Sequence, residues 1–231
     1  MDIKEKIMAL FFVTGIDTEI GKTIVTGNIA KYLASTGKKV TTMKPVQTGC
    51  TGIAEDIVTH RSIMGRELDI YDKNLITAPE IFKFPASPHL AAELENRTIN
   101  FEKIDKCIQI LNENFEVVLI EGAGGVYVPL TRDYTTLDFI ADRNFSVIIV
   151  SSPRLGSINH TMMTIEILKS RSINIAALVY NMYPPEKESI ANDSIKVIKH
   201  LSAKLGLNFP VFVNPFIGRD SDKIVEFAGL I

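Results

Sequence analysis

The sequence predicts an α/β fold, in which a mostly parallel, buried sheet carries helices on both faces. Three observations lead to this prediction. Apolar residues gather in short, nearly continuous runs instead of alternating with polar ones, as in strands that are covered on both faces. The stretches between these runs have the periodicity of amphipathic helices. A glycine-containing loop joins the first apolar run to the first helical stretch, where α/β proteins place phosphate loops.

In the first half of the chain, residues 9–13 are apolar throughout and are predicted to form a strand. Residues 23–35 place four apolar or aromatic side chains on one stripe, so we expect a helix there that ends before Gly37. Residues 40–43 are a more polar candidate for a strand. Residues 101–114 repeat apolar side chains at helical spacing and are predicted to form the next helix.

The second half repeats the alternation of strands and helices, which is the order typical of a parallel sheet. Two further stretches have helical periodicity, and one of them follows the pair Pro184-Pro185. Four apolar runs are predicted to be strands. The expected strands are residues 117–120, 147–150, 175–179 and 211–213, and the expected helices are residues 157–171 and 186–205.

No repeat, linker or low-complexity segment divides the chain, so residues 1–231 are predicted to form a single domain with residues 1–8 as a loose N-terminal extension. Residues 66–88 are the least regular stretch and contain three prolines. Two interpretations stand for them, an excursion near a ligand site and a plain surface loop, and the second is favoured.

Composition excludes several classes of function. The 25 basic residues are offset by 27 acidic ones, and no basic stripe favours a nucleic-acid partner. The longest apolar runs are far shorter than the roughly 20 residues that cross a bilayer, so no membrane partner is expected. Cys50 and Cys107 have no spacing that indicates a disulfide framework or a zinc site. We therefore expect a cytoplasmic protein.

The most informative segment is Gly-Ile-Asp-Thr-Glu-Ile-Gly-Lys-Thr at residues 15–23. Glycine suits a backbone that curls around anionic oxygens, and the N-terminus of the following helix attracts phosphate. Lys22 would reach the β- and γ-phosphates of a nucleotide, and the Thr23 hydroxyl would bind Mg²⁺. The spacing departs from the standard loop because five residues separate Gly15 from Gly21. An ordinary helix start capped by threonine is the less favoured alternative.

This loop resembles the Gly-Thr-Asp-Thr-x-Val-Gly-Lys-Thr loop of dethiobiotin synthetases, with Ile16 in place of threonine. Further segments match the same family in order, and they extend the resemblance from about residue 9 to about residue 222. These are Met-Lys-Pro-Val-Gln-Thr-Gly at 43–49, Ser-Pro-His at 87–89, Glu-Gly-Ala-Gly-Gly at 121–125 with Pro-Leu at 129–130, Leu-Gly-Ser-Ile-Asn-His at 155–160, and Asn181. Each motif is modest, but the ordered set is specific.

The resemblance implies a P-loop NTPase-like fold and a homodimer that binds substrate near the subunit interface. It also implies an ATP- and Mg²⁺-dependent ligase that makes dethiobiotin from 7,8-diaminopelargonic acid and CO₂. One amine captures CO₂ as a carbamate, ATP phosphorylates the carbamate, and the second amine closes a cyclic urea with release of ADP and phosphate.

The site residues follow from the same resemblance. Lys22 and Lys44 are the expected catalytic residues, and Thr23, Asp56 and Glu121 the expected Mg²⁺ ligands. For Asp56 the alternative is an acid that stabilises a helix N-terminus. Thr18, Thr48, Gly156 and Asn159 are expected to bind substrate, the last two across the dimer interface. The nucleotide would contact Glu19, Ile20, Gly21, Lys22, Thr23, Asp56, Glu121, Gly122, Ala123, Gly124, Asn181, Pro215, Phe216 and Ile217.

Residues 212–215 depart from the family's usual Gly-Glu-Ile-Pro turn, which leaves nucleotide selectivity open. Two other classes share the fold. Partitioning or septum-positioning ATPases carry a signature lysine where this chain has Asp17 and lack the Lys-Pro-Val-x-Thr-Gly segment. Ligases with a fused glutaminase domain need a chain longer than 231 residues. Fold alone does not separate these classes, but the site residues do.

Overall fold

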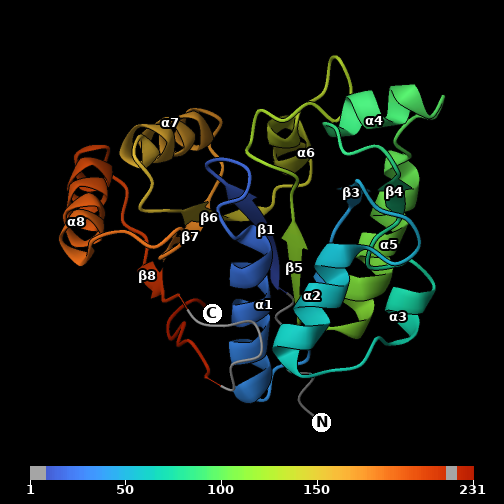
Figure 1. Cartoon of the computed structure of the whole chain (residues 1–231), viewed down its shortest axis with the longest axis horizontal. Coiled ribbons are helices and arrows are strands. Elements are labelled where there is room, and N and C mark those ends of the chain that lie inside the picture. Colours follow the sequence, from blue (N-terminus) through green and yellow to red (C-terminus); the bar gives the residue numbers. More distant parts are fainter. Residues whose placement is uncertain (1–8, 217–222) are drawn as a thin grey trace, which may run out of the picture.

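The computed structural model describes residues 9–216 and 223–231. A six-stranded sheet lies at its centre, with the strand order β2-β5-β1-β6-β7-β8 (Figure 1). Every pairing in this sheet is parallel, so the carboxyl ends of its strands lie at the same edge. All six predicted strands are present. They are β1 (Ala9–Gly15), β2 (Val40–Met43), β5 (Val117–Glu121), β6 (Ser146–Ser151), β7 (Ile175–Asn181) and β8 (Val211–Asn214).

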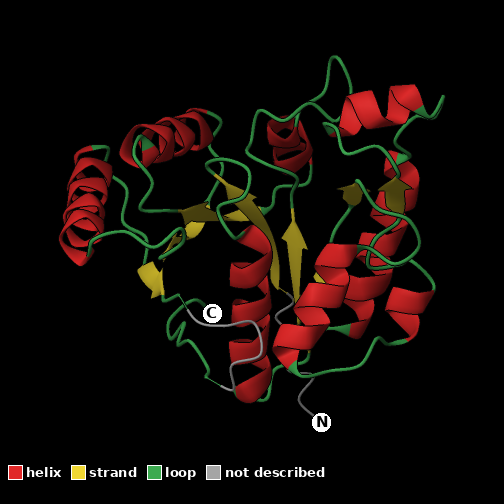
Figure 2. Cartoon of the chain, viewed as in Figure 1, coloured by secondary structure: helices red, strands yellow, loops and turns green. Residues whose placement is uncertain are grey.

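Helices cover both faces of this sheet, as predicted (Figure 2). Successive side chains of a strand point to opposite faces. In β5, Val117 and Leu119 pack with α1 (Lys22–Ser35), whereas Val118 and Ile120 pack on the other face. The helices on that other face are α5 (Phe101–Asn114), α6 (Thr136–Asp142), α7 (Ser157–Ser170) and α8 (Glu188–Lys204). The buried parallel sheet of the sequence-based prediction is therefore confirmed.

The four predicted helices are α1, α5, α7 and α8, and their ends differ from the prediction by no more than two residues. The periodicity did not predict α2 (Glu55–Met64), α3 (Ile70–Lys73), α4 (Pro88–Leu94) or α6.

The irregular stretch 66–88 is not the surface loop that the sequence favoured. It contains α3 and the strand β4 (Glu80–Phe82), which pairs in parallel with β3 (Val46–Thr48). Val46 of β3 and Phe82 of β4 belong to the same hydrophobic core as Met43 and Ile120. This small second sheet is thus packed firmly beside the carboxyl end of β2, and it positions the residues that follow Lys44.

A buried ion pair fixes α2 against α3. Arg61 Nε and Nη2 each donate to the carboxylate of Asp72, at 2.8 Å, and both side chains are almost completely buried. Asp72 also accepts hydrogen bonds from the Thr77 hydroxyl at 2.8 Å and from the backbone N–H of Asp69 at 3.0 Å.

Removing one partner of such a pair leaves an uncompensated buried charge. We expect Asp72→Ala to lower the free energy of unfolding by about 3–5 kcal/mol, measured by urea denaturation. The control is Asp133→Ala, which removes an exposed carboxylate and should change the free energy by less than about 0.5 kcal/mol. Equal stability of the two variants would contradict this account of α2 and α3.

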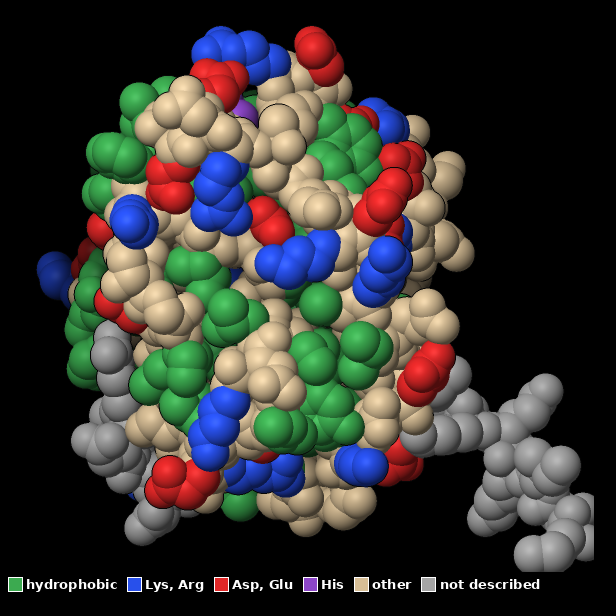
Figure 3. Space-filling view, turned by 90° about the vertical axis from the view of Figure 1, so that its right-hand side faces the viewer, with side chains coloured by type: hydrophobic (Ala, Val, Ile, Leu, Met, Phe, Trp, Pro, Cys, Tyr) green, Lys and Arg blue, Asp and Glu red, His purple; other side chains and the backbone are tan. Residues whose placement is uncertain are grey.

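The surface on the side of β3 and β4 has mixed charge. Lys and Arg side chains lie among Asp and Glu side chains there, without a stripe of one sign (Figure 3). Within residues 9–216 and 223–231, none of the helices combines the length and the apolar character needed to span a bilayer. Residues 1–8, predicted to be a loose extension, lie outside the described residues.

Candidate active site

A cleft of about 1140 Å³ opens at the carboxyl edge of the main sheet. Ligands of open α/β sheets bind at this edge. The cleft is lined by the loop after β1, the connection from β2 to β3, the start of α2, the segment after β4 and the exits of β5, β7 and β8. Fourteen of the predicted site residues line it: Thr18, Glu19, Gly21, Lys22, Thr23, Lys44, Thr48, Asp56, Glu121, Ala123, Gly124, Asn181, Pro215 and Phe216.

The loop of residues 15–21 leads from β1 into α1, as the sequence predicted. Gly21 has φ +85°, in the left-handed region, and a Cβ there would lie 2.3 Å from Asn181 Nδ2. Only glycine fits this position. The helix that follows begins at Lys22, so its first N–H groups have no carbonyl partners within the helix and are available to an anion.

Lys44 lies at the centre of the polar groups in the cleft. Its Nζ is 2.7 Å from Asp56 Oδ2 and 3.1 Å from Glu121 Oε1, and it donates to the carbonyl of Gly122 at 3.2 Å. Burial would lower the pKa of Lys44, but the carboxylates of Glu121 and Asp56 raise it above its usual value. Lys44 is therefore a fixed cation at neutral pH.

Lys22 is nearby and lies in a different environment. Its Nζ donates to the carbonyl of Asp17 at 2.9 Å. Burial, assisted by the positive charge of Lys44, lowers the pKa of Lys22 to about 8. The carboxylates of Glu121, Asp56 and Asp17 only partly offset these effects, and a bound triphosphate would add further negative charge beside this ammonium group.

Three oxygen-bearing side chains converge beside the two lysines. The Thr23 hydroxyl lies 2.9 Å from Glu121 Oε1 and 3.2 Å from Asp56 Oδ1. Burial would raise the pKa of Glu121, but Lys44 and a hydrogen bond from His60 hold it well below its usual value, so Glu121 is ionised. Two carboxylates and a hydroxyl are hard oxygen donors that suit Mg²⁺. Asp56 also lies in the first turn of α2. Its position therefore fits both interpretations of this residue, a Mg²⁺ ligand and an acid that stabilises a helix N-terminus.

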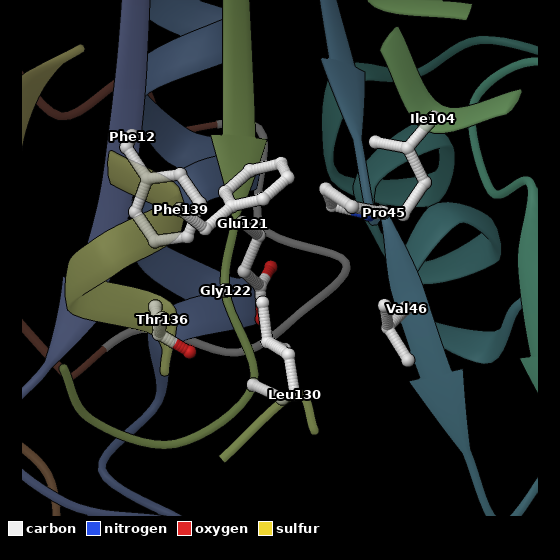
Figure 4. Close-up of a pocket in the computed structure, with 10 residues that line it drawn as sticks. Phe12, Pro45, Val46, Ile104, Glu121, Gly122, Leu130, Thr136 and Phe139 are labelled. Atoms are coloured by element: carbon white, nitrogen blue, oxygen red, sulfur yellow. The ribbon is translucent and has the colours of Figure 1, made fainter. Parts of the chain in front are cut away.

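The opposite side of Glu121 is apolar. A cavity of only about 20 Å³ lies there, bordered by Phe12 and Phe139 on one side and by Pro45 and Val46 on the other (Figure 4). Gly122 lines this cavity and not the cleft, and a Cβ on it would lie 2.7 Å from the Phe12 ring. Within the described part of the chain, the hydrogen-bond partners of the Glu121 carboxylate therefore come from α1, α2 and the residue that follows β2.

The other end of the cleft carries a chain of buried amides. Asn28 donates to Asn214 Oδ1, and Asn214 donates to Asn181 Oδ1, both at 2.8 Å. Asn181 in turn donates to the carbonyl of Ile20 at 2.7 Å. At the same end, the rings of Tyr183 and Phe216 stack with centroids 5.8 Å apart. Asn214 belongs to residues 212–215, the segment that departs from the family's usual turn, and it contacts Asn181 directly.

Besides Gly122, three predicted site residues in the described part of the chain do not line this cleft. Ile20 is buried, and only its carbonyl meets Asn181. Gly156 and Asn159, at the start of α7, are exposed and do not line the cleft of their own chain. Ile217 lies outside the described residues.

Some cleft residues were not predicted from the sequence. They include Gln47, Tyr183 and Asn214, and also the segment 85–88, which places the end of the irregular stretch at the cleft. The Ser-Pro-His match was the one signal that pointed to this segment. The sequence also indicated no role for His60, which does not line the cleft but contacts Glu121. His60 follows Asp56 by four residues and therefore lies one helical turn further along α2.

Comparisons with known proteins place the chain in a family. The model of an AAA domain family matches residues 10–211. An ATP-dependent dethiobiotin synthetase of Pasteurella multocida is 47% identical over 199 residues, which cover 86% of this chain and 93% of the relative. One of Chlorobaculum tepidum is 45% identical, over 84% of this chain and 82% of the relative. The chain belongs to the dethiobiotin synthetase family. Members of this family are ATP-dependent ligases that close a ureido ring in biotin biosynthesis.

Solved structures of other P-loop proteins share the fold of this dethiobiotin synthetase family member. A MinC:MinD cell division complex of Aquifex aeolicus matches with a TM-score of 0.54 and 18% identity, over 90% of this chain and 81% of that chain. The pNOB8 ParA structure bound to nonspecific DNA matches with a TM-score of 0.56 and 12% identity, over 94% and 90%. At such identities the likeness concerns the fold alone. By its place in the loop motif, the signature lysine of partitioning and septum-positioning ATPases corresponds to Asp17 of this chain. The Asp17 carboxylate forms an ion pair with Arg154.

Proposed function

We propose that this cleft joins 7,8-diaminopelargonic acid and CO₂ into dethiobiotin at the expense of ATP. The chain is an ATP-dependent ligase of the cyclo-ligase class. One observation carries the assignment of the site: Lys22, Lys44 and the oxygens of Thr23, Asp56 and Glu121 line one cleft. Phosphoryl transfer needs such a concentration of fixed charge around the transferred group and needs no protein nucleophile.

The reaction has three bond-forming steps. An amine of the substrate adds to the carbon of CO₂ and loses a proton, which gives a carbamate. A carbamate oxygen then attacks the γ-phosphorus of ATP in line, and ADP leaves. The second amine attacks the carbon of the resulting anhydride, closes the ring and expels phosphate. Thr18 and Thr48 line the cleft and hold the substrate through their hydroxyls.

The two lysines divide the negative charge between them. Lys22 lies at the N-terminus of α1, where the triphosphate would bind, and it neutralises the β- and γ-phosphates. Lys44 lies at the start of the segment that carries Thr48, so it stabilises the carbamate and the phosphoryl group in transit. Thr23, Asp56 and Glu121 would hold Mg²⁺, which when bound supplies positive charge to the phosphate oxygens.

We also propose that the protein acts as a homodimer in the cytoplasm and that residues 1–231 form one P-loop α/β domain. The exposure of Gly156 and Asn159, next to the fully exposed Leu155, supports a role for α7 in the cleft of a partner copy. The common core of the two sheets supports a single domain. A monomeric mass in sedimentation equilibrium would refute the dimer.

The function is tested by measuring phosphate release from ATP with each substrate omitted in turn. We expect release only when both the diamine and bicarbonate are present. The same assay with DNA or anionic lipid vesicles in place of the diamine tests the partitioning and septum-positioning class. Release that ignores the diamine, or that responds to DNA or vesicles, overturns the proposal.

Asn214 is expected to support nucleotide binding through Asn181. Asn214→Ala removes two buried hydrogen bonds and frees the amide of Asn181 to rotate. We expect the KM for ATP to rise by about 3- to 10-fold with little change in kcat. Asn192→Ala, at an exposed position of α8, is the control and should leave the KM unchanged. The assignment fails if both variants have the KM of the parent protein.

A further inference from the structure

His60 of α2 is completely buried, does not line the cleft, and has hydrogen-bond partners on both ring nitrogens. Its Nε2 lies 2.8 Å from Glu121 Oε2, and its Nδ1 lies 2.9 Å from the hydroxyl of Thr42. The register of β2 against β5 explains why these side chains lie close together. Thr42 of β2 lies opposite Leu119 of β5, so Thr42 and Glu121 are on the same face of the sheet, where α2 brings His60.

The two oxygens of Glu121 have different partners. Oε1 accepts from the Thr23 hydroxyl at 2.9 Å and from Lys44 at 3.1 Å, both of which line the cleft. Oε2 is hydrogen-bonded to His60, which is its one hydrogen-bond partner in the described part of the chain. His60 therefore fixes the rotation of the carboxylate, with one oxygen directed toward the cleft and the other away from it.

The neighbours of the ring determine which nitrogen carries hydrogen. Arg61 Nη1 donates to the Thr42 oxygen at 2.9 Å, and a guanidinium group has no acceptor. The single hydrogen of the Thr42 hydroxyl is thus free to point at His60 Nδ1, which leaves Nε2–H as the donor to Glu121. Asp72 holds Arg61 through two hydrogen bonds at 2.8 Å. Each donor in this row of side chains has an acceptor.

We propose that His60 is a positioning residue, which orients the Glu121 carboxylate for Mg²⁺ through a tautomer set by Thr42, Arg61 and Asp72. The inference rests on the proposed function, in which Glu121 is a metal ligand. A hydrogen bond from outside the coordination sphere fixes a carboxylate ligand and commonly changes metal affinity by about 10- to 100-fold when it is removed.

The test compares three variants by direct metal binding. Mn²⁺ is titrated by electron paramagnetic resonance against the full chain with a non-hydrolysable ATP analogue. We expect His60→Leu to weaken Mn²⁺ binding by about 10- to 100-fold. His60→Gln keeps an N–H that can reach Glu121 and should recover most of this loss. Thr42→Val leaves the ring in place but no longer fixes its tautomer, so it should give a smaller loss than His60→Leu.

His200→Leu replaces an exposed histidine of α8 and should bind Mn²⁺ like the parent. Circular dichroism and urea denaturation establish that each variant is folded, and Thr42→Val provides the test if His60→Leu is not. Parent-like Mn²⁺ affinity in a folded His60→Leu, or in Thr42→Val when His60→Leu does not fold, overturns the inference. So does an equal loss in His60→Leu and His60→Gln. Because Mn²⁺ binding needs no diamine, this test is separable from failure of the ring-closing activity.

Discussion

Lys44→Ala is expected to reduce the rate of ring closure by about 10²- to 10³-fold or more, because it removes the fixed cation beside the reacting groups. Lys44 is buried and contacts Asp56 at 2.7 Å and Glu121 at 3.1 Å, so its charge is held in place before the substrate arrives. The loss should appear in kcat, measured as dethiobiotin formed per active site. Nucleotide affinity, measured by calorimetry, should change little.

Lys44→Gln is the companion variant, because its amide still donates a hydrogen bond but carries no charge. It should be nearly as slow as Lys44→Ala if charge is what matters. The control is Lys38→Ala, an exposed position just before β2, which should keep parent activity. If Lys44→Ala keeps more than a tenth of the parent's kcat, Lys44 is not a catalytic residue.

Lys22→Ala is expected to lose both nucleotide affinity and turnover. A charge-assisted hydrogen bond to phosphate contributes about 1.5–3 kcal/mol, so the Kd for ATP should rise by about 10- to 100-fold. Turnover at saturating ATP should also fall by about 10²-fold or more, because the same ammonium group stabilises charge on the transferred phosphoryl group.

The effect of Lys22→Ala on Kd distinguishes it from Lys44→Ala. Removing Lys22 also removes a buried ammonium group whose pKa is lowered to about 8, so the fold should not be destabilised. Lys196→Ala, at an exposed position of α8, is the control. Parent-like ATP affinity in folded Lys22→Ala would show that residues 15–23 do not bind the triphosphate as the account requires.

The sequence was sufficient to predict the main sheet because its strands are buried on both faces. A run such as 147–150 has no polar alternation, which identifies it as an interior strand. The loop between β1 and α1 could also be located from the sequence, because glycines and a lysine at this spacing are typical of a loop that joins a strand to a helix and binds phosphate. The family resemblance then identified Lys44, Asp56 and Glu121, which no local pattern brings together.

Helix α2 shows why other features could not be predicted. Its buried side chains are Ile57, His60, Arg61 and Met64, together with Ile63, and the first four have the spacing of a helical stripe. Two members of that stripe are polar, so hydropathy alone does not reveal it. Their burial is favourable only because Asp72, Thr42 and Glu121, which are distant in sequence, provide hydrogen bonds.

The strands β3 and β4 were missed for a related reason. Each has three residues, and they pair with each other across more than thirty positions of the chain. Such short segments carry little periodicity, and their pairing depends on Val46 and Phe82 reaching the common core. The amide chain through Asn214 is likewise a tertiary arrangement, which appears in the sequence only as a departure from the family's turn.

The most direct measurement of the central claim is isotopic. The protein is supplied with the diamine, ¹³C-bicarbonate, ATP and Mg²⁺, and the products are followed by mass spectrometry and by ADP formation. The account predicts dethiobiotin with ¹³C in its ureido carbonyl and one ADP for each ring closed. ADP formed without labelled dethiobiotin, by a protein that binds ATP, would contradict it.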